Sequence, residues 1–360
     1  MIQDKIKEFN IPEIKDFFEK SNVKDPKTGR HLMLDMLLRE EYGYPPPIPD
    51  KISYEKISID ENYCAGKAVY EIYMLTSYIN DGDSFAFPVR IVRPNDDIKH
   101  PVFVHINFRP DIPDKYQPSE EIIDNGYAVV SFCYKEVTSD DNDFSTGLSG
   151  IIYKGKDRGD SDCGKIAMWS WAASRVIDMI TDMDIFDNDN MFVAGHSRLG
   201  KTSLLTAALD ERVKCAFVNG SGCSGDAVSR GSKGETVKDI TGSFPYWFCK
   251  NYYKYADNED KLPFDQHFLI AAVAPRYVLI SSAEKDLWAD PNNAYLSCAM
   301  ASYMWNLYGL AGFICEAGHP YTGCFYAGGN IAYSMRSGTH YQSRDDWHRY
   351  FEFAKIIMNS

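Results

Sequence analysis

The residues around Ser197 have the types and spacing that present a serine nucleophile. A short apolar run precedes this serine, a Leu- and Ala-rich run follows it, and Gly195 and Gly200 stand on either side. A strand that turns sharply through a serine into a helix projects the hydroxyl from the sheet edge, with the helix N-terminus beneath the developing negative charge. Such a turn strains the serine backbone, so its neighbours need little or no Cβ. The second glycine is displaced, because Leu199 stands where it usually falls, and a helix-capping serine is therefore the alternative interpretation.

A serine hydrolase also needs a base, and four histidines lie downstream of the serine. His340 is the preferred base, because it follows a glycine in a late loop just before a predicted helix, and such a loop can reach the sheet edge. His319 is its chief rival. His348 and His267 have the surroundings of helix residues.

The acid that would orient the histidine has candidates in two places. Asp286 follows a predicted strand with the spacing typical of this role, and Glu284 and Asp290 in the same loop are alternatives. The other place is the loop 219–222, after the strand that follows the elbow, where the next carboxylate is Asp226. Serine, acid and histidine thus occur in the chain order of the α/β-hydrolases.

The elements that must position these residues alternate between strand and helix, which predicts a mostly parallel sheet with helices on both faces. Residues 136–160 are polar, rich in Gly and Asp and too long for a simple connection, so we expect this loop to border a site. The predicted strands are 68–78, 84–92, 101–108, 127–134, 191–194, 213–218 and 277–281, and the predicted helices are 119–125, 165–183 and the run from 201 to 210.

The first part of the chain has a different pattern. Residues 1–43 predict two helices with a break at 25–29, and the proline-rich run 45–49 must be extended. We therefore expect an N-terminal helical arm over 1–50 that packs on a catalytic domain over 51–360.

Composition narrows the class of protein. A hydrophobic content of 44% predicts a globular core, and no apolar run approaches the roughly 18 residues of a membrane span. The net charge of −13 argues against nucleic acid or an anionic membrane as partner. Nine scattered cysteines give no disulfide framework and no zinc motif, so we expect no metal and no cofactor. We expect a monomer, cytoplasmic as the chain stands, or secreted or periplasmic if a leader has been removed.

Several ordered motifs resemble the bacterial branch of the glucuronoyl esterases, carbohydrate esterase family fifteen. The resemblance covers roughly residues 85–355 and accounts for the displaced glycine, since in that family Arg follows the serine and Gly-Lys comes after it. The matching stretches are Gly195-His-Ser-Arg-Leu-Gly-Lys201, Gly234-Glu-Thr236, Phe244-Pro-Tyr-Trp-Phe248, Leu262-Pro-x-Asp-Gln-His267, Ala274-Pro-Arg276, Ser282-Ala-Glu-x-Asp-Leu-Trp-Ala-Asp-Pro291 and Gly338-x-His340.

The resemblance implies an α/β-hydrolase, a three-layer sandwich, that cleaves esters between 4-O-methyl-D-glucuronic acid side chains of glucuronoxylan and lignin alcohols. It implies that Ser197 attacks the uronoyl carbonyl and that His340 accepts its proton. Arg198 would stabilise the oxyanion through its backbone N–H and its guanidinium. The substrate would be a small molecule or an oligosaccharide.

The resemblance also implies where the sugar binds. Lys201, one helical turn beyond the nucleophile, would bind sugar hydroxyls. Glu235 and Trp288 match family positions that hold the uronate ring, and a carboxylate and an indole suit a pyranose.

One position departs from the family pattern. Many members carry Glu after the strand that follows the elbow, and the matching residue here is Gly220. Asp286 matches the alternative acid position of other members, and we assign it the orienting role.

Two other functions fit the same residues. One is a related carbohydrate esterase that releases acetyl or feruloyl groups. The other is a carbohydrate-binding protein on an inactivated esterase fold, which only the missing acid at Gly220 favours. Covalent labelling of Ser197 by a serine-directed phosphonate separates an enzyme from a binding protein.

Replacing the assigned acid tests these expectations directly. Asp286→Asn should lower turnover strongly, because the histidine loses its orienting carboxylate, whereas Asp226→Asn should change it little. Steady-state turnover of both variants is the measurement. Near-normal activity in both would refute the assignment.

Overall fold

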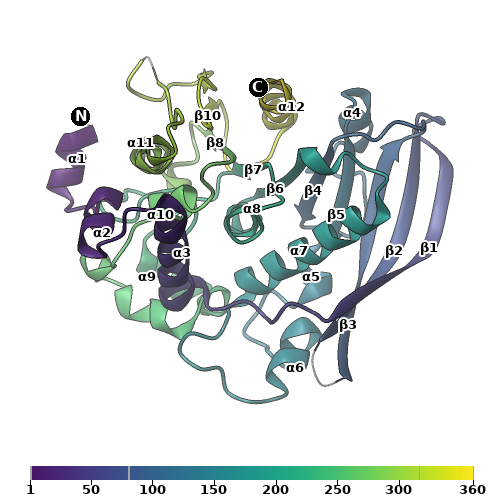
Figure 1. The fold of residues 1–360 in the computed structure, drawn as a ribbon, viewed down its shortest axis with the longest axis horizontal. Coiled ribbons are helices and arrows are strands. Elements are labelled where there is room, and N and C mark those ends of the chain that lie inside the picture. The colour runs from purple at the N-terminus through teal and green to yellow at the C-terminus, as the bar shows by residue number, and fades with distance from the viewer. Residues whose placement is uncertain (1, 80–81, 316, 360) are drawn as a thin grey trace.

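A computed structural model of the chain describes residues 2–79, 82–315 and 317–359 (Figure 1). Within these residues the strands form one ten-stranded sheet in the order β1-β2-β3-β5-β4-β6-β7-β8-β10-β9. The strands are β1 Lys51–Tyr63, β2 Ala68–Ile79, β3 Asp83–Pro94, β4 Val102–Asn107, β5 Ala128–Cys133, β6 Met191–His196, β7 Cys215–Asn219, β8 Tyr277–Ala283, β9 Phe325–Tyr326 and β10 Ile331–Arg336.

Helices cover both faces of the sheet. The α-helices are α1 Ile2–Glu8, α2 Ile14–Lys20, α3 Pro26–Leu37, α4 Ser119–Asp124, α5 Tyr134–Val137, α6 Gly147–Tyr153, α7 Lys165–Met183, α8 Arg198–Leu209, α9 Val237–Ser243, α10 His267–Ala271, α11 Pro291–Leu307 and α12 Arg344–Met358. A π-helical turn spans Leu38–Tyr42, and 3₁₀ turns span Asn188–Asn190, Pro245–Trp247, Lys250–Tyr255, Glu259–Lys261 and Leu287–Ala289.

The central strands β5, β4, β6, β7, β8 and β10 are parallel, whereas β1, β2 and β3 are antiparallel to their neighbours. Helices α7, α8, α10 and α11 lie on one face, and α4 and α12 lie on the other (Figure 1). The predicted α/β class, with its mostly parallel central sheet between two helical layers, is confirmed. The predicted helix over 165–183 has the bounds of α7.

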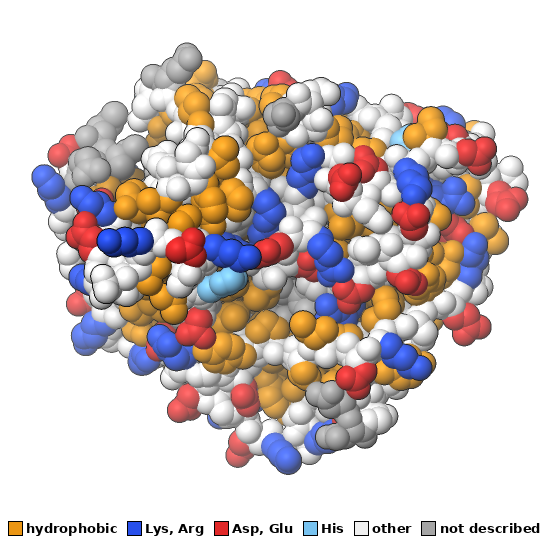
Figure 2. Space-filling model, in the orientation of Figure 1, with side chains coloured by type: hydrophobic (Ala, Val, Ile, Leu, Met, Phe, Trp, Pro, Cys, Tyr) orange, Lys and Arg blue, Asp and Glu red, His pale blue; other side chains and the backbone are white. Residues whose placement is uncertain are grey.

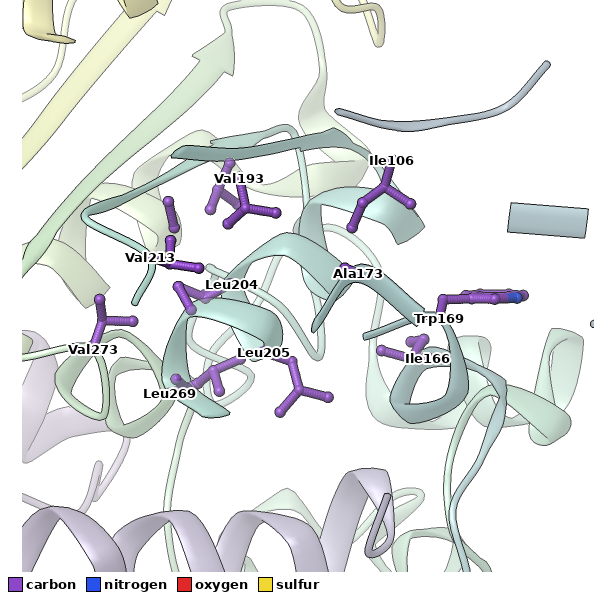
Figure 3. Packing of buried hydrophobic residues seen from close by; sticks show 14 of the residues in the cluster. Ile106, Ile166, Trp169, Ala173, Val193, Leu204, Leu205, Val213, Leu269 and Val273 are labelled. Atoms are coloured by element: carbon purple, nitrogen blue, oxygen red, sulfur yellow. The ribbon is translucent and has the colours of Figure 1, made fainter. Parts of the chain in front are cut away.

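The parallel strands are buried on both faces, and successive side chains enter opposite cores. Val193 of β6 and Ile106 of β4 join the larger core, where Leu204, Leu205 and Trp169 from the covering helices pack against them (Figure 3). This explains why the predicted strands are near-continuous apolar runs.

An aromatic core fills the opposite face. Phe103 of β4 contacts Phe192 and Phe217 on neighbouring strands at ring-centroid distances of 5.1 and 5.3 Å, and Trp347 of α12 at 5.4 Å. Every one of these side chains is fully buried. The C-terminal helix is thereby fixed against the strands from which the site residues extend.

The N-terminal helices differ from the prediction. Residues 25–29 start α3 instead of breaking it, because the Asp25 carboxylate accepts a hydrogen bond from Thr28 N at 2.8 Å and a proline follows at the first helical position. Gly29 lies inside the helix, where a Cβ would stand 2.0 Å from the Phe18 ring. Helix α3 packs on α10, and α2 packs on α11 (Figure 1). The division of the chain at residue 50 stays a prediction.

The polar stretch 136–160 is more structured than predicted, since α5 ends in it and α6 lies within it. Lys165 organises its first part. The Lys165 ammonium is buried and donates to the Thr138 hydroxyl at 2.8 Å and to the Asp143 carbonyl at 2.6 Å. A buried amine must satisfy its donors, so these bonds fix the loop.

On the face drawn in Figure 2, acidic and basic side chains are interspersed and apolar side chains lie between them. None of the described helices is long and apolar enough to cross a membrane. The carboxyl ends of the parallel strands meet at one edge of the sheet, which is where ligands bind in such folds. The loops after β6, β8 and β10 carry the serine, the acid and the histidine of the prediction.

Candidate active site

Ser197 occupies a strained turn between β6 and α8. Its backbone has φ +58° and ψ −127°, and its N–H donates to the Asn219 carbonyl at 2.8 Å. Gly195 allows this turn, because a Cβ there would lie 2.1 Å from the Leu199 carbonyl oxygen. The displaced Gly200 has a separate function: a Cβ there would stand 3.0 Å from the Ser221 side chain. The helix therefore begins directly after the serine, three residues earlier than predicted.

The predicted nucleophile, base and acid form one hydrogen-bonded chain. His340 Nε2 lies 2.9 Å from Ser197 Oγ, and His340 Nδ1 lies 2.6 Å from Asp286 Oδ2. The carboxylate is buried, whereas the histidine side chain is 44% exposed. With Nδ1–H donating to the carboxylate, Nε2 has the lone pair that can accept the serine proton.

The alternative acids and bases lie elsewhere. Asp290 caps α11, where its side chain accepts from Asn293 N at 3.1 Å, and Glu284 is exposed. His319 is an exposed loop residue whose Nδ1 faces the Ala317 carbonyl, and His348 pairs with Glu121. His267 is buried in α10.

Gly220 lies beside the histidine, directly after β7. Its φ is +51°, and a Cβ there would stand 3.3 Å from Asp286 Oδ2 and 3.5 Å from His340 Nδ1. Acids from either strand end would thus converge on the same imidazole nitrogen. The carboxylate that occupies this place comes from β8.

His196 also belongs to the site, although the sequence reasoning gave it no role. Its ring lies 4.5 Å from the His340 ring, and its Nδ1 lies 2.6 Å from Asn219 Oδ1. Burial, and secondly the neighbouring His340, lowers the pKa of His196 to about 3. A neutral imidazole therefore supports the base. Its position directly before the nucleophile is the signal that could have identified it.

Arg198, in the first turn of α8, pairs with the carboxylate of Asp140, a residue that the sequence reasoning missed. Its Nη1 donates to Asp140 Oδ2, and the same carboxylate accepts from Trp247 Nε1 at 2.8 Å and from the Tyr134 hydroxyl at 2.9 Å. Asp140 lies in the polar loop 136–160, which the sequence predicts to border a site. That prediction was the sequence signal that could have pointed to Asp140.

Aromatic rings hold the same guanidinium from another side. The Arg198 guanidinium lies 4.6 Å from the Trp247 ring centroid and 5.4 Å from that of Phe244, and these two rings stack at 4.0 Å. Its Nε is buried and has no hydrogen-bond partner among the described residues. The side chain is thus fixed by one charged hydrogen bond and two rings, and it is 24% exposed. Its remaining N–H groups are the kind of donor that stabilises an anion.

Lys201 is buried one helical turn beyond the serine. Its ammonium donates to the carbonyls of Ser221 and Cys223, which use two of its three donors. Buried carboxyls surround it: burial raises the pKa of Asp226 to about 6 and that of Glu41 to about 8, and the Lys201 charge acts to lower both. The residue is therefore part of the wall of the site, with an acidic layer behind it.

Glu235 and Trp288 lie on the same side of the serine as this lysine. Burial raises the pKa of the Glu235 carboxyl. Three smaller effects act to lower it: the charge of Lys201, a hydrogen bond from the Trp288 side chain and the nearby His340. The backbone N–H of Glu235 donates to the Trp288 carbonyl at 2.9 Å, an approach that Gly234 permits because a Cβ there would lie 2.3 Å from that oxygen. Trp288 is 59% exposed, so its indole faces solvent beside the carboxylate.

The structure therefore brings together Ser197, His340, Asp286, Arg198, Lys201, Glu235 and Trp288, the residues to which the sequence analysis gave catalytic or substrate-binding roles. Among the described residues, no group of three His, Cys, Asp or Glu side chains is arranged to hold a metal ion. An elbow serine in hydrogen-bonded series with a histidine and a buried aspartate, on this sheet, has the geometry of an α/β-hydrolase.

Comparison with known proteins gives the family. A family model described as "Glucuronyl esterase, fungi" matches residues 77–309, and the chain belongs to this glucuronoyl esterase family. Carbohydrate esterase MZ0003, from an unknown prokaryotic organism, is 41% identical over 243 residues, which cover 66% of this chain and 55% of that protein. The chain spans about half the length of the first curated relatives that it matches.

Two solved structures share nearly the whole fold. The glucuronoyl esterase from Solibacter usitatus has a TM-score of 0.82 and 28% identity, with 91% of each chain covered. A promiscuous CE15 esterase from a marine bacterial metagenome has a TM-score of 0.81 and 30% identity, with 91% of this chain and 90% of that chain covered.

The contacts of Asp140 predict that it holds the guanidinium of Arg198 in place. Asp140→Asn should lower kcat by about 10-fold with a smaller change in KM, because the charge that orients the arginine is lost. Steady-state kinetics and a melting curve measure the two effects.

Asp141→Asn is the matched control. Asp141 belongs to the same loop, but its carboxylate accepts from the Ser139 hydroxyl and from Asp143 N. Equal kcat values for the two variants would contradict the role of Asp140.

Proposed function

We propose that the chain is a serine esterase that hydrolyses esters of D-glucuronic acid or its 4-O-methyl ether, as in linkages between glucuronoxylan and lignin. The observation that carries this proposal is the hydrogen-bonded series Ser197–His340–Asp286, with Arg198 directly after the serine and Glu235 near enough to His340 to be influenced by its charge. Family membership and a relative named carbohydrate esterase support it.

The first half of the reaction forms an acyl-enzyme. His340 Nε2 accepts the proton of Ser197 Oγ as that oxygen attacks the uronoyl carbonyl, and the Asp286 carboxylate stabilises the imidazolium that results. The imidazolium then protonates the leaving alkoxide, so the alcohol departs and the uronoyl group remains on the serine. In the second half, a water attacks this ester with the same histidine as base. The bond to Ser197 Oγ then breaks, the imidazolium returns the proton to this oxygen, and the uronic acid is released.

Arg198 supplies the charge that stabilises the tetrahedral oxyanion. As the first residue of α8 it has a backbone N–H without an intrahelical acceptor, and its side chain has the buried, uncommitted Nε. The conventional second donor in this fold comes from the loop after the strand that corresponds to β4. Here the N–H of Phe108 in that loop donates to Asn107 Oδ1 at 2.7 Å. The Arg198 guanidinium can supply the second donor in its place.

The sugar ring is expected between Lys201, Glu235 and Trp288. The carboxylate can accept from two neighbouring hydroxyls, the third donor of the ammonium can reach a hydroxyl oxygen, and the exposed indole can donate or stack. Acetyl esters have no ring to fill this position. The selectivity for a uronate thus depends on these three residues.

The decisive experiment compares kcat/KM for benzyl D-glucuronate, benzyl D-galacturonate and p-nitrophenyl acetate, with Ser197→Ala as the inactive control. We expect the glucuronate ester to be preferred over the acetate by about 100-fold or more. Glu235→Gln should lower kcat/KM on the glucuronate by about 10- to 100-fold, the effect of a weakened charged hydrogen bond, and leave the acetate unchanged.

A general carbohydrate esterase is the second candidate, because one 30% identical neighbour is described as promiscuous. Similar kcat/KM for acetate and glucuronate, together with an ineffective Glu235→Gln, would establish that alternative. A binding protein on an inactive fold would give no turnover of any ester.

A further inference from the structure

One guanidinium holds the loop that carries the catalytic base. Arg336 is the last residue of β10, and its Nη1 donates to the Ser337 carbonyl at 2.8 Å. Its Nη2 donates to the carbonyls of Thr339, at 3.2 Å, and Tyr341. The last two carbonyls belong to the residues directly before and after His340. The arginine thus fixes the backbone on both sides of the base.

The guanidinium is itself anchored to the helix that follows. Arg336 Nε donates to Asp346 Oδ2 at 2.8 Å, and the same oxygen accepts from Ser343 N at 2.7 Å and from the Ser343 hydroxyl at 2.9 Å. Asp346 is 2% exposed and caps α12. This buried ion pair links the end of β10, the loop and the start of α12 into one unit.

The glycine of the Gly-x-His motif has a place in this arrangement. Gly338 has φ +101°, and a Cβ there would stand 3.0 Å from Arg336 Nη1. Glycine therefore provides both the backbone conformation and the room for the guanidinium.

The same loop is tied to the loop that carries the acid. Glu284 N donates to the Arg336 carbonyl and Lys285 N donates to the Gly338 carbonyl, each at 2.9 Å. Asp286 follows directly. The relative position of base and acid thus depends on a backbone that Arg336 holds in place.

We propose that Arg336 is a positioning residue that sets the orientation of His340 toward Ser197 and Asp286. The inference rests on the serine-hydrolase chemistry proposed above. Because the base extends from an irregular loop and is partly exposed, its own side-chain packing is limited, and the surrounding backbone must supply its precision. A guanidinium can donate in its plane to four acceptors, which a lysine ammonium cannot do.

The test measures the activation of the serine independently of the sugar. The second-order rate of covalent labelling by a serine-directed alkyl phosphonate is measured for the wild type and for Arg336→Lys, with Ser197→Ala as the blank. We expect labelling to slow by about 10- to 100-fold, the effect of a misplacement of roughly 1 Å. On p-nitrophenyl acetate, kcat should fall similarly while KM changes less than about threefold.

Arg276→Lys is the matched control. Arg276 precedes β8 at the opposite edge of the sheet, and it too donates to three carbonyls, those of Ala207, Asp210 and Val213. It should lower the melting temperature without slowing the labelling. Equal labelling rates for Arg336→Lys and the wild type, or equal losses in the two lysine variants, would overturn the inference.

Gly338→Ala is a second test variant, for use if Arg336→Lys does not fold. This variant retains Arg336 but crowds its Nη1, so it should slow labelling of Ser197 in the same way. An unchanged labelling rate would contradict the proposal. A wild type that is labelled rapidly but does not cleave glucuronate esters would refute the proposed function and leave the role of Arg336 intact.

Discussion

The turn at Ser197 is the constraint on which the rest of the site depends. A serine at φ +58° is tolerated only because Gly195 lets the chain fold back to within 2.1 Å of where its Cβ would be. The strain is offset by the packing of α8 between two buried strands and the neighbouring helix α7. In return the hydroxyl stands at the sheet edge, and the next residue begins a helix. That next residue, Arg198, is thereby placed directly beside the hydroxyl in the chain.

The arrangement of charges in the site depends on two cationic side chains, Arg198 and Lys201, in the first turn of α8. Arg198 faces a carboxylate and stacked rings, so its charge is oriented but partly neutralised. Lys201 is buried on backbone carbonyls before a layer of acids that includes Asp226, whose pKa burial raises. The two cations therefore differ in surroundings: the Arg198 guanidinium pairs with a carboxylate, whereas the Lys201 ammonium binds two backbone carbonyls beside buried acids. A neutral His196 beneath the base adds no further charge.

The carboxylate that orients the histidine does not have to come from one fixed position in the chain. Gly220 directly follows β7, the strand that neighbours β8, and a Cβ there would lie 3.5 Å from the imidazole nitrogen that the Asp286 carboxylate contacts. Two adjacent parallel strands end at the same edge of a sheet, so a carboxylate from either can reach one histidine. Both arrangements need the histidine in the same position. Its loop carries no regular secondary structure, and the ion pair between Arg336 and Asp346 holds it in place.

The sequence by itself indicated the α/β class, helix α7 and the candidates Ser197, Asp286 and His340, because apolar runs, a glycine-bracketed serine and strand-end loops are local patterns. It left Glu284, Asp290 and His319 open, and the contacts of Asp286 and His340 in the folded chain distinguish them from these alternatives. It did not predict that residues 25–29 would start a helix, since a capping aspartate and a proline resemble a break when the contact of Gly29 with Phe18 of α2 is not known. Only the tertiary structure decided which carboxylates meet which cations. Asp140 lies 58 residues from its arginine, and a contact over that distance in sequence has no local signature.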